Sequence, residues 1–378
     1  MNTLKLLLLG IFATIGLTAC GGDSKDQPEV NTDNKITLDC TVSTDFDANE
    51  ASFNIAVASP FEWDATCSAD WVNLTKKGTL EKQGTISVEI KKNSNRQSRT
   101  AEIVVRNARN GQASLTVKQA GKEPEPVDPT IQVPEGYELV WNDEFDSGSE
   151  LNRDKWTHEV QGAGWVNNEL QHYVNGSYDG IRVTEVSDGV LTITASKTAG
   201  RVISGRVYAN VDTGWKYGIF EARIKLPKGK GTWPAFWMMP ANNDWGSTPW
   251  PLCGEIDIME EVGTNANYTS SSIHCDAYNH TKGTQKTAER FTADAEGEFH
   301  VYRLEWTEES IRTFVDGHAL LTFYNDKTGN VRTWPFNKPF YVILNLAWGG
   351  DWGGMNGVDE SALPAKMEVD YVRVFQKI

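Results

Sequence analysis

Short runs in which apolar and polar residues alternate recur along most of the chain, and they predict β-strands. Examples are "TISVEIKK" and "TAEIVVRN" in the first third, and "YGIFEARIKL", "HVYRLEWT" and "KMEVDYVRVF" in the remainder. Turn segments rich in Gly and Asn separate these runs, and no useful helix-period segment lies between them. The pattern therefore predicts an all-β protein made of antiparallel sheets.

A proline-rich segment at residues 122–135 divides this pattern in two. Its prolines remove backbone donors and stiffen the chain, so we expect the two sides to fold separately. Residues 36–121 predict a small immunoglobulin-like β-sandwich. Residues 136–378 predict a larger two-sheet sandwich of the jelly-roll type.

The first residues are typical of an export signal. Residues 1–19 contain one early positive charge and an apolar run that is too short to span a bilayer as a helix. "LTAC" resembles a bacterial lipobox, which implies cleavage before Cys20 and acylation of its sulfur; a plain secretory signal or an uncleaved anchor is the alternative. Residues 20–35 read as a flexible tether, and their acidic, Gly-rich start resembles surface-export signals. We therefore expect an outer membrane lipoprotein that faces the cell exterior.

Charge and cysteine content narrow the choice of partner. The formal charge of -15 argues against nucleic acid and favours a neutral partner, and we expect a monomer. The cysteines after Cys20 match no zinc pattern, and an oxidising compartment permits disulfides. Pairs Cys40–Cys67 and Cys253–Cys275 would keep each bond within one domain; buried free thiols are the alternative.

The segment "GEIDIMEE" places four carboxylates in a strand-like run. In a regular strand Glu255 and Asp257 share one face, whereas Glu260 has the wrong parity. A β-bulge at Met259 would turn Glu260 onto the shared face and leave Glu261 outside it.

This spacing suits acid–base chemistry. Glu255 and Glu260 would lie roughly 13 Å apart along the backbone, and inward-leaning side chains bring their carboxyl groups to about 5–5.5 Å, the separation found in retaining glycosidases. Asp257 between them would hydrogen-bond the nucleophile and keep the proton on the acid by like-charge repulsion. A solvated strand face is the alternative.

Tryptophans surround these acids in segments broken by Gly, Asn and Asp, which makes them harder to bury. Flat aromatic faces stack on the apolar faces of pyranose rings, so the cluster favours a carbohydrate site. Its members are Trp233, Trp237, Trp245, Trp250, Trp348 and Trp352, whereas Trp141, Trp156 and Trp306 are expected in the core.

Upstream, "FEWDATCSADWVNLT", "NSNRQSRTAEIVV" and "LTVKQAG" resemble the BACON domain, a module often found before carbohydrate enzymes. The recurring positions of that module are mainly structural residues. We therefore expect residues 36–121 to act as a spacer, with glycan binding as the second possibility.

Downstream, "GEIDIMEE", "GTWPAFWMMP", "YGIFEARIKLP", "WVNNELQHYV" and "MEVDYVRVF" resemble glycoside hydrolase family 16, in its laminarinase and mixed-linkage glucanase branch. The resemblance implies a concanavalin-like β-jelly-roll that cuts a β-glucan internally with retention. It implies Glu255 as nucleophile, Asp257 as its helper and Glu260 as general acid/base. No cofactor is implied for catalysis.

The resemblance also suggests residues for substrate and calcium. Sugar hydroxyls would be held by Glu221, Arg223 and Asn168, and the remaining candidates are Trp233, Trp237, Trp250, Trp348 and His274. His274 either tunes Glu260, binds substrate or is a buried structural histidine. A structural Ca²⁺ far from the chemistry would take the Glu144 side chain, the Gly189 carbonyl and Asp370, an unoccupied pair of surface acids being the alternative.

Three functions remain open. The first is a cell-surface endo-β-glucanase acting on β-1,3 or mixed β-1,3/1,4 linkages. The second is a non-catalytic glycan-binding lipoprotein on the same scaffold, which the intact Glu255, Asp257 and Glu260 disfavour. The third is a related enzyme that cleaves galactans or transfers glycosyl groups. The "GTWPAFWMMP" element favours the first.

Overall fold

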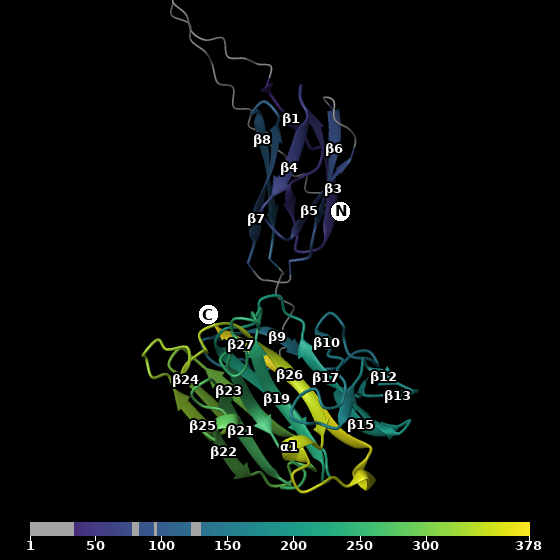
Figure 1. Cartoon of the computed structure of the whole chain (residues 1–378), viewed down its shortest axis with the longest axis vertical. Helices are drawn as coiled ribbons and strands as arrows, with labels where there is room; N and C mark the ends of the chain where they lie inside the picture. Colours follow the sequence, from purple (N-terminus) through teal and green to yellow (C-terminus); the bar gives the residue numbers. More distant parts are fainter. Residues whose placement is uncertain (1–33, 78–82, 94–96, 122–129) are drawn as a thin grey trace, which may run out of the picture. The chain divides into compact units, whose positions relative to one another are not determined.

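The computed structural model describes residues 34–77, 83–93, 97–121 and 130–378, which form two compact units. The predicted signal peptide 1–19, Cys20, nearly all of the tether and residues 122–129 of the predicted linker lie outside the described residues. Within the described part of the chain, no helix has the length and apolar character needed to span a membrane. Strands dominate both units, so the all-β prediction is confirmed (Figure 1).

The N-terminal unit is a sandwich of two four-stranded sheets with the orders β1-β3-β6-β5 and β2-β8-β7-β4. Alternate residues of each strand point inward, and Ile55, Ile86 and Ile103 are fully buried between the sheets. Its strands are β1 (Thr37–Asp39), β2 (Asp45–Phe46), β3 (Ala51–Ala58), β4 (Trp63–Cys67), β5 (Val72–Lys77), β6 (Gln83–Ile90), β7 (Arg99–Asn107) and β8 (Gln112–Gln119).

Polar residues quoted for the BACON resemblance hold the chain at one end of this sandwich. Arg99 Nε donates to Gln119 Oε1 at 2.9 Å, and the Asn93 amide donates to the carbonyl oxygens of Gln97 and Ala120. Asn93 and Gln119 are fully buried. These bonds serve the fold, as the sequence predicts for these positions.

The C-terminal unit packs a seven-stranded sheet against a ten-stranded one. The seven-stranded sheet has the order β10-β17-β26-β19-β20-β21-β22 and is antiparallel throughout. Its strands are β10 (Trp156–His158), β17 (Arg206–Ala209), β19 (Thr232–Pro240), β20 (Glu255–Glu260), β21 (Tyr268–His274), β22 (Lys286–Phe291) and β26 (Phe340–Trp348).

The ten-stranded sheet has the order β11-β16-β15-β27-β18-β23-β24-β25, with β14 paired to β15 and β9 paired to β27. Its strands are β9 (Tyr137–Asp143), β11 (Gln171–Tyr173), β14 (Thr184–Ser187), β15 (Val190–Thr198), β16 (Arg201–Ser204), β18 (Gly218–Lys225), β23 (His300–Trp306), β24 (Ser310–Val315), β25 (His318–Tyr324) and β27 (Ala365–Lys377). A hairpin of β12 (Ser177–Tyr178) and β13 (Ile181–Arg182), the short helix α1 (Gly350–Gly353) and 3₁₀ turns at His280–Lys282 and Glu360–Ala362 complete the unit.

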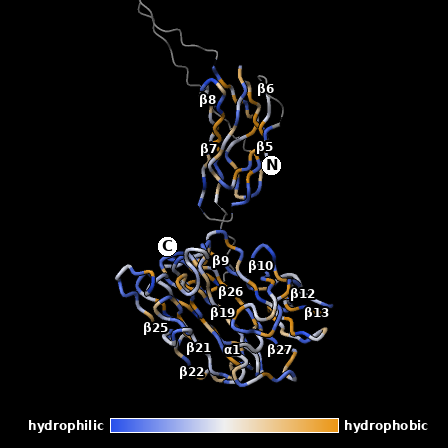
Figure 2. Tube along the Cα trace, viewed as in Figure 1, coloured by the Kyte–Doolittle hydropathy of each residue, from blue (hydrophilic) through white to orange (hydrophobic). Residues whose placement is uncertain are grey.

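The main core fills the space between these two sheets. Phe236, Met259 and Leu344 from the seven-stranded sheet meet Phe220 and Leu304 from the other. Figure 2 shows apolar positions concentrated along the strands and polar positions in the connecting loops. Because one face of the seven-stranded sheet is covered in this way, its other face is free to form a site; we call this other face the open face.

The expectation about tryptophans in the core is confirmed. Trp156 and Trp306 are buried, and Trp141 is partly buried against the same core.

Both predicted disulfide pairings are wrong, since Cys40, Cys67, Cys253 and Cys275 are free. Cys253 packs with Met239 and Ile343 on the open face, whereas Cys275 belongs to the core between the sheets. The sheet therefore separates the two thiols, and the alternative of buried free thiols holds for this pair.

Candidate active site

A β-bulge in β20 brings the acids of "GEIDIMEE" onto the open face. Asp257 pairs with Ser272 and Glu260 with Ser270, so two residues of β20 oppose the single residue Ser271 of β21. The pairing with β19 shifts at the same place. The predicted bulge is therefore confirmed, and it removes the parity conflict of Glu260.

Tryptophan indoles hold the two outer acids. Trp233 Nε1 donates to Glu260 Oε1 at 2.9 Å, and Trp250 Nε1 donates to Glu255 Oε2 at 3.1 Å. Trp233 also packs edge-on against Trp352 of α1, with ring centroids 5.5 Å apart. Each carboxyl group is thus fixed by an aromatic ring that also borders the space above it.

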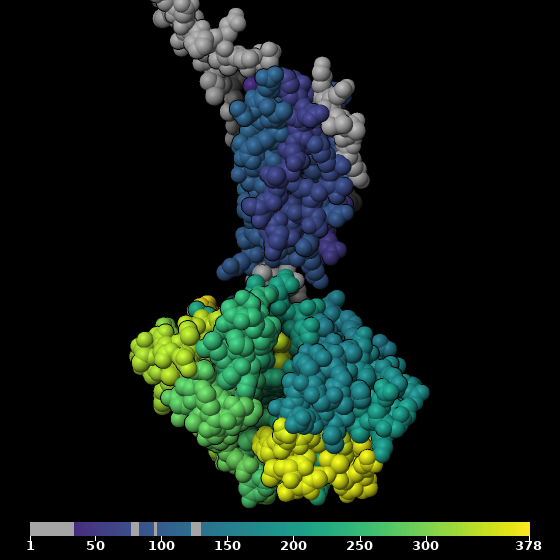
Figure 3. Space-filling model, viewed as in Figure 1, coloured from purple at the N-terminus to yellow at the C-terminus, as the bar shows by residue number. Residues whose placement is uncertain are grey.

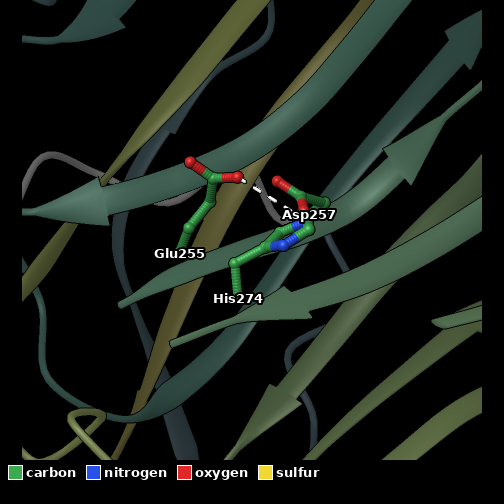
Figure 4. A group of neighbouring side chains, drawn as sticks. All are labelled: Glu255, Asp257 and His274. Atoms are coloured by element: carbon green, nitrogen blue, oxygen red, sulfur yellow. Dashed lines mark ion pairs between the residues drawn. The ribbon is translucent and has the colours of Figure 1, made fainter. Parts of the chain in front are cut away.

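His274 lies opposite Glu255 on the neighbouring strand β21. Its Nε2 is 3.2 Å from Asp257 Oδ2 and 3.9 Å from Glu255 Oε1, as Figure 4 shows. Among the described residues no such ion pair joins His274 to Glu260. The buried histidine therefore faces Asp257 and Glu255. Its charge also lowers the pKa of Glu260, so the predicted tuning of Glu260 is supported through charge and not through a direct contact.

The acids share an environment that disfavours charge. Burial, with the neighbouring Asp257 as the second cause, raises the pKa of both Glu255 and Glu260 to about 8. Burial also raises the pKa of Asp257 well above its ordinary value. Because closely spaced carboxylates do not all ionise together, the cluster retains a proton at neutral pH. His274 and a tryptophan indole lower the pKa of both Glu255 and Glu260. His274 is 3.9 Å from Glu255, and this contact favours Glu255 as an ionised member.

The open face is hollowed beside these acids. Figure 3 shows a deep hollow between the green segment that contains β20 and β21 and the teal segment around residues 150–180, with yellow residues near 350 along its lower border. Trp233, Trp237 and Trp250 are half-buried and face this side of the sheet. These three predicted substrate-binding residues are thus brought together with the acids.

Asn168 lies at the rim of this region. It adopts a positive φ of 52°, and its amide donates to Asp351 Oδ1 of α1 at 2.8 Å. Because α1 also carries Trp352, the Asn168 side chain anchors a wall of the hollow; direct contact with a sugar stays a prediction.

Trp348 does not belong to the open face. It is 1% exposed, and its place in β26 has the parity of the core residues Leu344 and Leu346. Its prediction as a stacking residue is therefore wrong, because the alternation of the strand turns its ring under the sheet.

Glu221 and Arg223 are also placed elsewhere. Both lie on β18 of the ten-stranded sheet. Glu221 accepts a hydrogen bond from the Tyr371 hydroxyl at 3.0 Å, and Arg223 pairs with Asp370 at 2.7 Å. The main core separates them from the acids of β20, so the prediction that they hold substrate is wrong.

The predicted calcium ligands meet at one edge of β27, where β15 and β9 pair with successive parts of this strand. Both oxygens of Glu144 accept hydrogen bonds from Arg373, at 3.0 and 2.8 Å, and Asp370 Oδ2 is paired with Arg223. The Glu144 side chain therefore does not fit a calcium ligand. Calcium at Gly189 and Asp370 stays a prediction, and no catalytic step depends on it.

Sequence reasoning missed a buried polar chain that supports Trp237. Trp237 Nε1 donates to Asn345 Oδ1, the Asn345 amide donates to the Tyr173 hydroxyl, and that hydroxyl donates to Glu169. Glu169 also raises the pKa of Glu260 through its charge. The available signal is the segment "WVNNELQHYV", in which Glu169 and Tyr173 lie close to the predicted residue Asn168.

Arg206 was missed as well. Its guanidinium lies 4.7 Å from the Trp237 ring centroid and 5.0 Å from that of Trp165, and its Nε pairs with Glu159 at 2.7 Å. The Arg206 side chain is largely buried, so its charge is not free to bind a ligand. It holds the rings of Trp165 and Trp237 in place instead.

Buried carboxylates on one bulged strand, with indoles bonded to two of them and aromatic rings beside them, define the site of a glycoside hydrolase. The model of the family "Glycosyl hydrolases family 16" matches residues 170–373, and that of the BACON family, "Putative binding domain, N-terminal", matches residues 61–120. The chain belongs to glycosyl hydrolases family 16, and both family resemblances seen in the sequence are confirmed, as is the jelly-roll fold.

Known relatives agree with this assignment. A β-glucanase of Rhodothermus marinus is 45% identical over 247 residues, which are 64% of this chain and 85% of the relative. The structure of the laminarinase from Rhodothermus marinus matches with a TM-score of 0.61 and 44% identity, covering 64% of this chain and 98% of that one. A variant of SCLam, a non-specific endo-β-1,3(4)-glucanase with a bound glucan oligosaccharide, matches with a TM-score of 0.61 and 44% identity, covering 65% of this chain and 97% of that one.

Proposed function

We propose that this protein is a retaining endo-β-glucanase that hydrolyses β-1,3-glucans, mixed β-1,3/1,4-glucans or both. The observation that carries the proposal is the trio Glu255, Asp257 and Glu260 on the open face of one bulged strand, with separate indole donors for the outer two. A pure binding protein has no need for buried acids that retain a proton at neutral pH.

The arrangement assigns a role to each carboxyl group. Ionised Glu255 attacks the anomeric carbon while protonated Glu260 donates its proton to the glycosidic oxygen, so that a covalent glycosyl-enzyme forms and the leaving chain departs as an alcohol. Glu260, now ionised, then removes a proton from water as that water attacks the anomeric carbon, which releases Glu255. Asp257 and His274 set the charge around Glu255 during both steps.

The surroundings suit a neutral polysaccharide. Trp233, Trp237 and Trp250 offer aromatic surface beside the acids. The guanidinium of Arg206, which lies against Trp237, is already paired with Glu159. Stacking and neutral hydrogen bonds therefore dominate recognition. The names of the relatives, a β-glucanase and an endo-β-1,3(4)-glucanase, support glucan as the polysaccharide.

The test compares four polysaccharides. Purified protein is incubated with laminarin, barley mixed-linkage glucan, cellulose and agarose, alongside Glu255→Ala and Glu260→Ala. Glu298→Ala, which removes an exposed carboxyl group from the same unit, is the matched control. We expect oligosaccharides of several lengths from one or both of the first two glucans, with activity lost in the two site variants and kept in the control.

Product analysis then separates the alternatives. Linkage analysis of the oligosaccharides identifies the bond that is cut, and NMR of the newly formed reducing end reports retention. Products from agarose alone would assign a galactan-cleaving enzyme. Intact substrates throughout, with glucan binding kept in both site variants, would overturn the hydrolase proposal in favour of a binding protein.

A further inference from the structure

A second groove lies on the open face at the ends of β17 and β19 and the start of β26. Its volume is about 310 Å³, and aromatic rings and amides line most of it. The rings belong to Tyr208, Tyr341 and Trp245, and the amides to Asn210, Asn242 and Asn243. None of the groove residues is charged, and all fall within the described segment 130–378.

The groove is continuous with the floor of the reaction site. Tyr341 pairs with Met239 of β19, and Met238 beside it pairs with Ile256, the neighbour of Glu255. Tyr341 is therefore two strands away from β20, a distance of about 10 Å.

Packing joins the two places. Tyr208 and Tyr341, with ring centroids 5.5 Å apart, pack against the same small apolar cluster as Trp237 and Trp250. One apolar cluster therefore connects Trp250, which binds Glu255, with the rings that line the groove.

The chemistry of the groove matches a neutral sugar ring. Trp245 is 50% exposed, so its face is free to stack on a pyranose. Burial raises the pKa of Tyr341 to about 12, which leaves its hydroxyl neutral and able to donate at any assay pH. Exposed aromatic surface beside neutral hydrogen-bonding groups suits glucose and disfavours phosphate or sulfate esters, which need cations.

The loop that carries Trp245 is held in place. Asn242 Nδ2 donates to the Asp212 carbonyl, Asn243 Nδ2 donates to the Thr248 carbonyl, and Lys338 donates to Asn243 Oδ1. These bonds fix both sides of the loop before any ligand arrives, which reduces the entropy lost on binding.

We propose that the groove formed by Tyr208, Tyr341 and Trp245 binds a further glucosyl unit of the same chain, remote from the bond that is cut. The inference rests on the proposed glucanase function and deepens it. The groove makes the enzyme favour long chains, because only a chain that extends beyond the reaction site places a sugar on Tyr341 and Trp245.

The test measures kcat/KM for laminari-oligosaccharides from the trisaccharide to the heptasaccharide, or for mixed-linkage oligosaccharides of the same lengths if those are cut faster. For Trp245→Ala we expect the ratio of kcat/KM between the longest and the shortest substrate to fall about tenfold. Tyr341→Phe, which removes only a hydroxyl, gives a smaller fall in the same ratio. The matched control is Tyr324→Ala, an exposed aromatic at the end of β25 in the other sheet.

Two outcomes overturn the subsite. One is an unchanged ratio in Trp245→Ala, and the other is an equal fall in Tyr324→Ala. Failure of the glucanase function is distinguishable, since the unsubstituted protein would then cut no oligosaccharide of any length. In that event, titration calorimetry measures the affinity of both proteins for the heptasaccharide. Weaker binding in Trp245→Ala than in the unsubstituted protein supports the subsite. Equal affinity of the two proteins, or no binding by either, rejects it.

Discussion

Replacing Glu261 by glutamine tests how burial controls the charge of the acid that ends the "GEIDIMEE" run. The bulge leaves Glu261 off the open face, as the sequence predicts, yet its side chain is fully buried rather than solvated. One oxygen accepts from the Asn267 backbone N–H, and the other has no partner. Burial, with Glu296 as the second cause, raises the pKa of Glu261 to about 8.

The direction in which stability changes with pH follows from the linkage between protonation and folding. A carboxyl group whose pKa is higher in the folded state stays protonated there while the unfolded chain ionises, so its contribution to stability is greatest below pH 4.5 and is lost as the pH rises toward 8. With these two pKa values, the loss between pH 5 and pH 8 is about 3–4 kcal/mol. Glutamine has no such titration, its amide oxygen still accepts from the Asn267 backbone N–H, and it carries no charge to oppose that of Glu296.

The assay is urea unfolding at pH 5, 6, 7 and 8, followed by tryptophan fluorescence; twelve of the fourteen tryptophans lie beyond residue 136 and report on the C-terminal unit. We expect similar stability of the two proteins at pH 5 and a Glu261→Gln variant more stable by about 3 kcal/mol at pH 8. Glu255, Asp257 and Glu260 are present in both proteins, so their titrations cancel in the difference. Glu298→Gln is the exposed control, and a difference that stays constant from pH 5 to pH 8 would refute the reasoning.

Four further predictions concern the site and the predicted anchor. Trp250→Phe removes a donor that lowers the pKa of Glu255, so the acid limb of the pH profile of kcat/KM should move to higher pH; an unmoved limb contradicts this. Glu260→Gln should slow glucan hydrolysis by about 10²–10⁴-fold but slow an aryl β-glucoside with an acidic leaving group far less, and equal losses would argue against its role as the acid. Arg206→Lys should lower kcat/KM on long glucans, since an ammonium lacks the planar face between two indoles; unchanged kinetics would count against it. Cys20→Ala should move the protein from the membrane fraction to the supernatant, and continued sedimentation with the membrane would disprove lipidation.

The sequence was informative where the chemistry is local. Alternation of apolar and polar residues predicted the two β-sandwiches, because the strand period decides which side chains meet a core. The parity conflict of Glu260 predicted the bulge, since a carboxylate needed on one face of a strand can reach it only through an extra residue. The family motifs around these acids also predicted the reaction class, hydrolysis of a glycosidic bond.

Positions that depend on which sheet a strand joins were beyond this reasoning. Glu221 and Arg223 were predicted from the family resemblance by motif position, but pairing with β23 and β27 places them on the far sheet. Trp348 belongs to a cluster of tryptophans broken by Gly, Asn and Asp, but its parity in β26 buries it. Cys253 and Cys275 are suitably spaced for a bond, and only the sheet between them keeps them apart.

By itself, then, the sequence determined the all-β class, the bulged acidic strand and the carbohydrate chemistry that its tryptophans indicate, because each depends on residues close together in the chain. The tertiary structure alone decided that His274 faces Asp257, that Asn345 and Arg206 brace Trp237, and that Tyr208, Tyr341 and Trp245 share one groove. Those contacts join residues that are 17 to 133 positions apart in the chain. Strand order and register bring them together, and the spacing of residues along a chain does not encode either.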